Sequence, residues 1–252
     1  MKRNLFLNPR IYDPEYVITR LRCDDLKVLV KKYLAQNGKS TVIDFGSRES
    51  PYKAFFSEHI DRFLMADLVL DNNDPHIDIK IDRDGHLHHP SNSVDMVLSL
   101  QVLEHVPNVE LYLEEAHRVL KPGGILWLTT HGMWPYHPTP EDYYRWTLSG
   151  LSRIVGSRFQ VVETDGIMGG PSYALMIYMH LLWEGTRKLN SIQGRIFGTK
   201  VKKELFFPLG NILFWALAIP LNLVMMGVDY ATPRRFKEKE SAIFRIAARK
   251  KV

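Results

Sequence analysis

The sequence has a single cysteine, Cys23, and this scarcity limits the chemistry open to the chain. One thiol cannot form an internal disulfide framework or a zinc site built from several cysteines. The Gly-x-Gly-x-x-Gly pattern of dinucleotide-binding folds is also absent, which argues against a nicotinamide enzyme. The apolar run after the basic start, Leu5 to Leu7, is too short for a signal peptide, so we expect a cytoplasmic protein.

Charge is distributed unevenly along the chain. The formal net charge is +5, but residues 1–184 hold 19 Lys and Arg against 24 Asp and Glu, whereas residues 185–252 hold 14 against 4. A tail with a balance of +10 (14 minus 4) favours an anionic partner such as phospholipid or nucleic acid. Because the tail has no recognised nucleic-acid motif and contains an apolar run, we expect no nucleic-acid partner.

Hydrophobic patterning indicates strands that alternate with helices, which is typical of a doubly wound α/β fold. We expect seven strands in a mostly parallel, Rossmann-like sheet with helices on both faces. We predict three units: a core at 1–166, a helical insert at 167–238, and a last strand at 239–252 that returns to the core sheet. The expected strands are 41–45, 62–67, 76–81, 94–100, 125–130, 159–163 and 242–248, and the expected helices are 13–36, 51–59 and 109–120.

Two acidic residues mark the predicted carboxyl edge of this sheet. Asp44 ends the first strand and is followed by Gly46, where the backbone can approach a ligand closely. Asp67 ends the second strand, 21 residues after Gly46, which matches the spacing of about 20 in nucleotide-binding βαβ units. An acid at this position can accept hydrogen bonds from ribose hydroxyls.

The next segments carry a family resemblance. The fourth strand leads into Val102-Leu103-Glu104-His105, and the sequence Arg118-Val119-Leu120-Lys121-Pro122-Gly123-Gly124 follows. Together they resemble class I S-adenosylmethionine-dependent methyltransferases over about residues 40–165. The first loop departs from the family, because Ser47, Arg48, Glu49 and Ser50 replace its further glycines. The resemblance implies S-adenosylmethionine as cofactor. It implies that Asp44, Gly46 and Ser47 form the loop beside the methionine part of the cofactor and that Asp67 binds the ribose. It further implies that Asp82 lies near the adenine, that Leu100 and Gln101 form the floor of the cofactor site, and that Glu104 and His105 fix the loop after the fourth strand.

The segment 130–147 is rich in histidine, aromatic residues and carboxylates. It resembles a stretch found in methyltransferases associated with bacterial cell-surface polysaccharide. Methyl transfer to a hydroxyl needs in-line geometry and a base, and the resemblance implies His137 or His131 as that base. Asp142 would orient a histidine or hold a sugar hydroxyl. The alternative interpretation is a structural lid in which Arg145 forms a salt bridge and no proton moves.

A second group of histidines, His86, His88 and His89, has residue types that can bind metals. No clear carboxylate pattern accompanies it, so we expect a solvated loop there and predict no metal site in the chain.

The insert contains a run of 24 uncharged residues, Leu205 to Val228. About 20 apolar residues suffice to cross a bilayer, but one crossing would separate the last strand from its own sheet. We therefore expect residues 185–238 to lie on an anionic membrane surface, with the protein peripheral on its inner face. Packing against the core or against a second subunit remains the alternative, and no oligomeric state is predicted.

The favoured hypothesis is O-methylation of a saccharide or lipid-linked glycan. A small lipid or quinone-like acceptor, and a noncatalytic cofactor-binding or scaffold protein, are the competing hypotheses.

Overall fold

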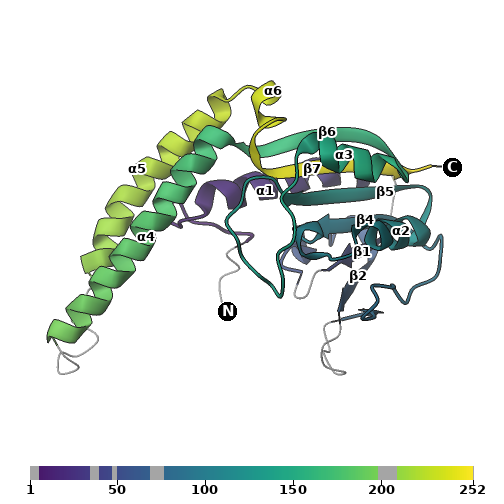
Figure 1. The fold of residues 1–252 in the computed structure, drawn as a ribbon, viewed down its shortest axis with the longest axis horizontal. Helices are drawn as coiled ribbons and strands as arrows, with labels where there is room; N and C mark the ends of the chain where they lie inside the picture. The colour runs from purple at the N-terminus through teal and green to yellow at the C-terminus, as the bar shows by residue number, and fades with distance from the viewer. Residues whose placement is uncertain (1–5, 35–39, 47–49, 69–76, 198–208, 252) are drawn as a thin grey trace.

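The fold is described from a computed structural model, which describes residues 6–34, 40–46, 50–68, 77–197 and 209–251. A seven-stranded sheet forms its centre, in the order β3-β2-β1-β4-β5-β7-β6 (Figure 1). The strand β7 runs antiparallel to both neighbours and the other pairs are parallel, which confirms the predicted, mostly parallel sheet. The strands are β1 (Ser40–Phe45), β2 (Ile60–Leu68), β3 (Ile79–Ile81), β4 (Val94–Leu100), β5 (Leu120–His131), β6 (Phe159–Gly169) and β7 (Ser241–Lys250).

Helices cover both faces of the sheet because alternate strand residues point to opposite sides. Ile43 and Val97 belong to a core cluster with α2 (Val109–Val119) and α3 (Leu148–Gly156). Their neighbours Val42 and Met96 belong to a cluster with α1 (Tyr16–Leu29), which continues as a π-helical turn, Val30–Leu34. Figure 1 shows α2 and α3 in front of the sheet and α1 behind it.

The prediction of a helix at 51–59 is wrong. The segment forms only a short 3₁₀ turn, η2 (Lys53–Phe55). Tyr52 and Phe56 are buried at a helix-like spacing of four, and Phe56 stacks on Phe63 with ring centroids 5.6 Å apart. The spacing of apolar residues that predicted a helix therefore indicates only which side chains are buried against α1 and β2. A pair of turns buries these side chains as well as a helix would.

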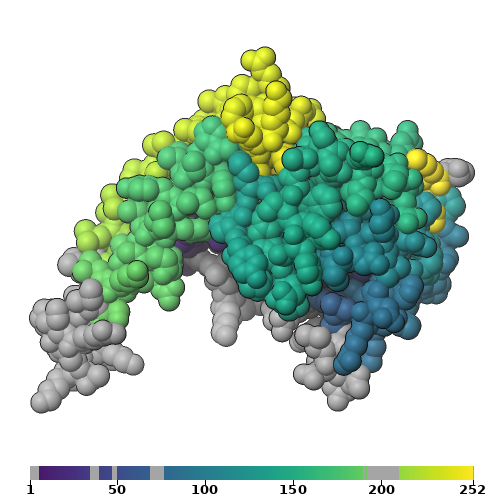
Figure 2. Space-filling model, viewed as in Figure 1, coloured from purple at the N-terminus to yellow at the C-terminus, as the bar shows by residue number. Residues whose placement is uncertain are grey.

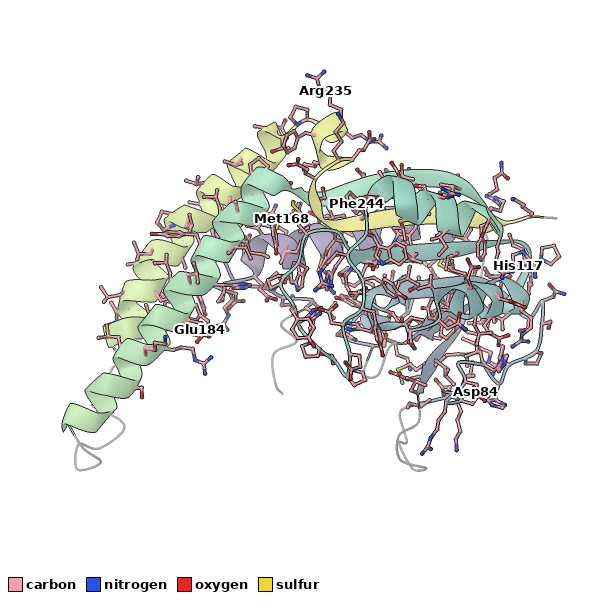
Figure 3. All side chains as sticks on the ribbon, viewed as in Figure 1. Asp84, His117, Met168, Glu184, Arg235 and Phe244 are labelled. Carbon is pink, nitrogen blue, oxygen red and sulfur yellow. The ribbon has the colours of Figure 1, made fainter. Side chains whose placement is uncertain are left out.

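The insert folds as a helical hairpin of α4 (Gly170–Phe197) and α5 (Leu209–Ala231), followed by the short α6 (Arg234–Lys237). The hairpin projects from the sheet as an arm (Figures 1 and 2). At its base it shares a core cluster with the start of α1 and the ends of β6 and β7, including Met168, which Figure 3 labels at this junction. Because β6 leads into the arm and β7 returns from it, both ends of the arm are fixed to one sheet.

Buried polar side chains hold α5 to the core. Asn222 is fully buried and donates hydrogen bonds to the carbonyl oxygens of Ile11 and Asp13, at 2.7 and 3.2 Å. Asp229 accepts hydrogen bonds from the Gly169 amide at 2.9 Å and from Lys237 Nζ at 2.6 Å. These bonds would be lost if α5 left the core, so they oppose its withdrawal into a bilayer.

A buried ionic network joins α1 to the sheet. Arg245 of β7 is 2% exposed, and its Nε lies 3.0 Å from Asp25 Oδ1. Its other nitrogen NH2 lies 3.4 Å from Glu163 and 3.1 Å from Asp165, and the guanidinium lies over the Trp127 ring. No sequence pattern pointed to this network, because its members come from four separate elements.

Candidate functional site

The carboxyl ends of β1 and β2 form the first part of the site. The Gly46 amide donates a hydrogen bond to the Ala66 carbonyl at 2.7 Å, which brings Gly46 level with the end of β2 and Asp67. Gly46 has a φ of +91°, and a Cβ there would lie 2.4 Å from Val102 Cγ1. Only glycine fits this turn without strain, because both the conformation and the space exclude a side chain.

Asp44 is 2% exposed, and burial raises its pKa to about 7, helped by the nearby Asp67 carboxylate. No described residue forms an ion pair with Asp44, and a buried acid of this kind is costly to ionise, so the site favours a positively charged group beside it. Ser47, the remaining member of the predicted loop, lies outside the described residues.

Tyr112 supports this loop from below. Its hydroxyl donates toward the Phe45 carbonyl at 2.9 Å and contacts Ser99 Oγ at 2.8 Å, and its ring stacks on Phe45 with centroids 4.0 Å apart. Burial, followed by the carboxylates of Asp44, Glu104 and Asp67, raises the pKa of Tyr112. The negative charges of Asp44, Glu104 and Asp67 thus all act on the Tyr112 hydroxyl, which lies between the cofactor edge and the Glu104 region.

The other predicted cofactor residues differ in their surroundings. Asp82 is half-buried, and its Oδ1 accepts hydrogen bonds from the amides of Asp84 and His86, so this carboxylate shapes a turn. Hydrogen bonds from these amides, chiefly that of His86, hold the pKa of Asp82 below its usual value. Gln101 has a φ of +60°, and its Nε2 donates to Thr129 Oγ1 at 2.9 Å. Its buried Oε1 has no hydrogen-bond partner among the described residues, and so can accept a bond from a ligand.

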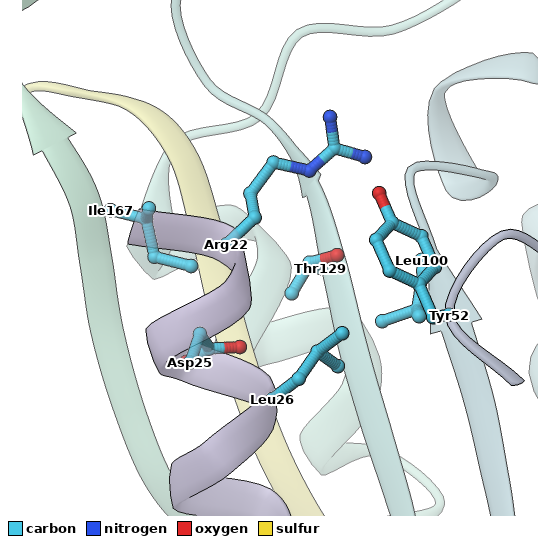
Figure 4. A pocket seen from close by; sticks show the side chains of 7 residues that line it. All are labelled: Arg22, Asp25, Leu26, Tyr52, Leu100, Thr129 and Ile167. Atoms are coloured by element: carbon cyan, nitrogen blue, oxygen red, sulfur yellow. The ribbon is translucent and has the colours of Figure 1, made fainter. Parts of the chain in front are cut away.

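A small pocket lies next to Leu100, on the α1 side of the sheet. Figure 4 shows Arg22 and Asp25 of α1 facing Thr129 and Leu100 at the ends of β5 and β4. Leu26, Tyr52 and Ile167 complete the lining. The predicted floor residue Leu100 therefore faces a pocket, and Arg22 is a polar residue there that no sequence pattern indicated.

Glu104 and His131 form the buried centre of the second part of the site. Glu104 lies on a 3₁₀ turn directly after β4, η3 (Leu103–His105), and His131 ends β5. Glu104 is fully buried, and its Oε1 lies 2.9 Å from His131 Nδ1, while its Oε2 accepts a hydrogen bond from Thr130 Oγ1 at 2.7 Å. Burial opposes ionisation of Glu104, but His131 and Thr130 together hold its pKa below the ordinary value.

Burial lowers the pKa of His131, against the attraction of Glu104, so its imidazole is neutral near pH 7. The ring stacks face to face on Trp134, with centroids 4.6 Å apart and planes at 3°. A neutral, rigidly held imidazole beside a carboxylate can accept a proton or bind a metal ion.

His137 approaches this pair from the 132–147 loop. Its ring lies 4.8 Å from that of His131 and 5.0 Å from that of His105, centroid to centroid. The structure thus brings together both predicted bases and the Glu104-His105 pair.

Asp142 and Arg145 hold the loop in shape. The two Asp142 oxygens each lie 2.6 Å from an Arg145 nitrogen, and Arg145 also donates to the carbonyls of Trp134 and Pro135. Asp142 Oδ2 accepts the His137 amide at 2.9 Å, and the Arg145 guanidinium holds the Asp142 pKa far below its usual value. Asp142 therefore positions His137 through the backbone, and its oxygens are already occupied within the loop.

The fit to an S-adenosylmethionine site rests on three features of this chain. Gly46 packs closely on Val102 in a turn with a positive φ; among the described residues Asp44 is buried without an ion pair, and Gln101 Oε1 has no hydrogen-bond partner. A model of the methyltransferase domain matches residues 65–128, which include β4, η3, α2 and the start of β5. Residues 65–128 are therefore similar to a methyltransferase domain.

Similarity to known proteins agrees with a methyltransferase domain. A Mycolicibacterium smegmatis protein named a probable S-adenosylmethionine-dependent methyltransferase is 30% identical over 115 residues, which are 42% of this chain and 44% of that protein. The chain thus matches less than half the length of this relative. An S-adenosylmethionine-dependent methyltransferase from Mesorhizobium loti has a TM-score of 0.51 at 14% identity, covering 91% of this chain and 98% of that one.

The cyclase SpnF has a TM-score of 0.54 at 15% identity, covering 91% of this chain and 81% of that one. These structural likenesses show the fold alone. Because a cyclase has the same fold, the fold alone does not identify the reaction, which depends on the side chains at the site.

Glu104, which the resemblance predicts to fix its loop, also contacts His131, 27 positions later, and Arg22 lines a pocket although no sequence pattern indicates it. A signal was present, because a carboxylate after one strand and a histidine at the end of its neighbour share the same edge of a parallel sheet.

Proposed function

We propose that this chain methylates a hydroxyl group of a saccharide or lipid-linked glycan, using S-adenosylmethionine. The observation that carries the proposal is that two kinds of group lie at the carboxyl ends of neighbouring parallel strands, on one edge of the sheet. Asp44, Gly46 and Asp67 would hold the cofactor, and the neighbouring Glu104, His131 and His137 can handle a proton. When bound, S-adenosylmethionine supplies an electrophilic methyl group.

The residues of this chain have defined tasks in the proposed reaction. The imidazole of His131 or His137 would accept the acceptor proton as the hydroxyl attacks. Glu104 stabilises the positive charge that a protonated His131 would carry, since their atoms are 2.9 Å apart. Asp142 and Arg145 keep His137 in place.

Aromatic side chains support a saccharide as the acceptor. Tyr136 and Tyr143 are 72% and 49% exposed on the loop beside the histidines, where they could pack on the apolar face of a sugar ring.

The exposed face of α5 supports an acceptor attached to lipid. Gly210–Ala231 is long and apolar enough to cross a membrane by length and composition, yet only 22% of its most apolar window is buried. Basic side chains Arg234 and Arg235 lie at the base of the arm, and Arg235 points outward in Figure 3. The arm would lie on an anionic membrane without crossing it, because Asn222 and Asp229 bind α5 to the core. The exposed large apolar and aromatic residues described on the arm are Ile212, Leu213, Trp215, Leu217, Ile219, Leu223, Val224 and Tyr230 on α5, and Tyr178 and Leu181 on α4.

A transfer assay tests the acceptor class. The purified chain is incubated with methyl-labelled S-adenosylmethionine and separate fractions of lipid-linked saccharides, free oligosaccharides and quinones. We expect label in a saccharide fraction, in a methyl ether that survives alkaline hydrolysis. Label in the quinone fraction alone would replace the proposed acceptor, and S-adenosylhomocysteine binding without any transfer would favour the noncatalytic alternative.

Vesicle flotation tests the membrane surface. The double substitution Leu223→Gln and Val224→Gln removes two side chains that are 53% and 54% exposed. Losing their burial in lipid should weaken partitioning into anionic vesicles by about 100-fold. The matched control, Val28→Gln with Val162→Gln, changes two exposed residues of the core domain and should float like the wild type. Equal flotation of both variants, or none by the wild type, would assign the exposed face to a subunit interface instead.

A further inference from the structure

The side chains around Glu104 form a cluster with the composition of a metal site. One ligand atom from each of Glu104, His131 and His137 lies within 4.8 Å of the other two. Two ligands of one metal ion are about 3–3.5 Å apart, since metal–nitrogen and metal–oxygen bonds are about 2.0–2.2 Å long. A small rotation of His137, which lies on a loop and is the most exposed of the three, would close the remaining distance.

The same cluster contains three polar atoms that are buried without a hydrogen bond. Glu104 Oε1, His131 Nδ1 and His137 Nδ1 have no hydrogen-bond partner among the residues that the structure describes. Although Oε1 and His131 Nδ1 are 2.9 Å apart, they do not meet in hydrogen-bond geometry. Unsatisfied buried polar atoms are costly, so three of them in one place call for a common partner.

His105 adds a further nitrogen to this cluster. Its Nδ1 donates a hydrogen bond to the Glu141 carbonyl, which can only accept, and its other ring nitrogen is Nε2. Nε2 lies 4.0 Å from Glu104 Oε1. A histidine that donates one ring N–H to a carbonyl and presents the other nitrogen has the orientation usual for metal ligands.

The groups around the cluster are compatible with a cation. Thr130 hydrogen-bonds the second oxygen of Glu104, as supporting groups do for carboxylate ligands. The guanidinium of Arg145 forms a bidentate pair with Asp142, so its positive charge is balanced within the loop.

In contrast to the sequence-based expectation of no metal site, we propose that Glu104, His131 and His137, assisted by His105, bind one divalent transition-metal ion; the proposal rests on the methyl transfer proposed above and replaces the imidazole base by a metal ion. Two imidazoles and one carboxylate suit zinc, iron(II) or manganese, and such sets leave a position open for a water or substrate oxygen. This position adjoins the cofactor edge through Val102, which contacts Gly46 and stands two residues before Glu104. A bound metal ion would make a hydroxyl at this position more acidic than in water, so that its proton could leave to solvent.

Metal titration tests the proposal without requiring methyl transfer. The full chain, freed of metal with a chelator, is titrated calorimetrically with zinc chloride and with manganese chloride. We expect one site per chain, and His137→Ala should weaken it by about 10-fold or more, because losing even an outer-shell partner costs that much. The control His88→Gln changes an exposed histidine outside the cluster and should bind like the wild type.

Cobalt(II) supplies an independent readout, since its visible absorption reports the geometry of nitrogen and oxygen ligands. Binding of S-adenosylhomocysteine by each variant shows that the domain is folded. Equal metal affinity in the wild type and in His137→Ala, or no site in the wild type, would overturn the metal proposal. If the chelated chain still transfers methyl groups at full rate, the imidazoles act as bases, and only the metal proposal fails.

Discussion

Replacing Asp44 by asparagine should make the protein more stable at neutral pH and weaken its cofactor binding. The side chain is 2% exposed, and burial raises its pKa to about 7. In the unfolded chain the same group has a pKa of about 3.9. Between these values the folded protein holds a proton that the unfolded chain has already released.

The difference sets the size and sign of the effect. A shift of about 3 pKa units corresponds to about 4 kcal/mol, at about 1.4 kcal/mol per unit. Because the folded-state pKa is raised, this contribution to stability is fully present below pH ~4 and is lost as the pH rises through ~7. Asparagine has nearly the same shape and never ionises, so the variant should gain up to about 4 kcal/mol over the wild type between pH ~4 and ~8.

Urea unfolding of both proteins across this pH range measures the effect. The quantity to compare is the difference between their unfolding free energies, since other titrating groups then largely cancel. A difference that stays constant with pH, or that favours the wild type as the pH rises, would refute the buried, protonated state of Asp44.

Calorimetry with S-adenosylhomocysteine tests the role of the charge. If an ionised Asp44 faces the amino group of the ligand, binding by the wild type should tighten as the pH rises toward 7 and then level off. The Asp44→Asn variant should bind more weakly and lack this dependence. A pH dependence that survives the substitution would assign it to another group.

Four further substitutions probe the fold and the site. Asp67→Ala should weaken S-adenosylhomocysteine binding by about 1.5–3 kcal/mol, the cost of losing bonds to an ionised acceptor, and unchanged calorimetric affinity would contradict the ribose role. Gly46→Ala should destabilise the domain in thermal unfolding, because its Cβ would lie 2.4 Å from Val102 Cγ1 at a φ of +91°. His137→Ala should lower turnover by about 10²–10⁴-fold with little change in S-adenosylhomocysteine affinity, and equal turnover would remove this residue from the reaction. Asn222→Ala should cost about 1–3 kcal/mol in urea unfolding, because the Ile11 and Asp13 carbonyls lose their donor, and an unchanged midpoint would show that α5 is not anchored there.

The sequence by itself determined the order of strands and helices along the chain. It also determined which residues stand at the carboxyl ends of β1 and β2. Buried strands appear as short apolar runs, and a parallel sheet puts their carboxyl ends together, so the positions of Asp44, Gly46 and Asp67 follow from local pattern alone. The resemblance of residues 94–126 to methyltransferases was equally local, because those residues form consecutive elements.

Tertiary structure decided the features that depend on distant partners. Burial of Tyr52 and Phe56 against α1 replaced the helix expected at 51–59 by turns, since their spacing fixes which side chains are buried but not the backbone between them. The network of Arg245 with Asp25 joins residues 220 positions apart.

The proton-handling cluster shows the same limit most clearly. The sequence of segment 130–147 indicated His131, His137 and Asp142 as candidate site residues. Folding determined which groups each of these side chains contacts. Asp142 is bound by Arg145, whereas Glu104 meets His131 across adjacent strands. Local sequence fixes which residues reach an edge of the sheet, and the close packing of loops over that edge fixes which of their atoms meet, because packing depends on every neighbour at once.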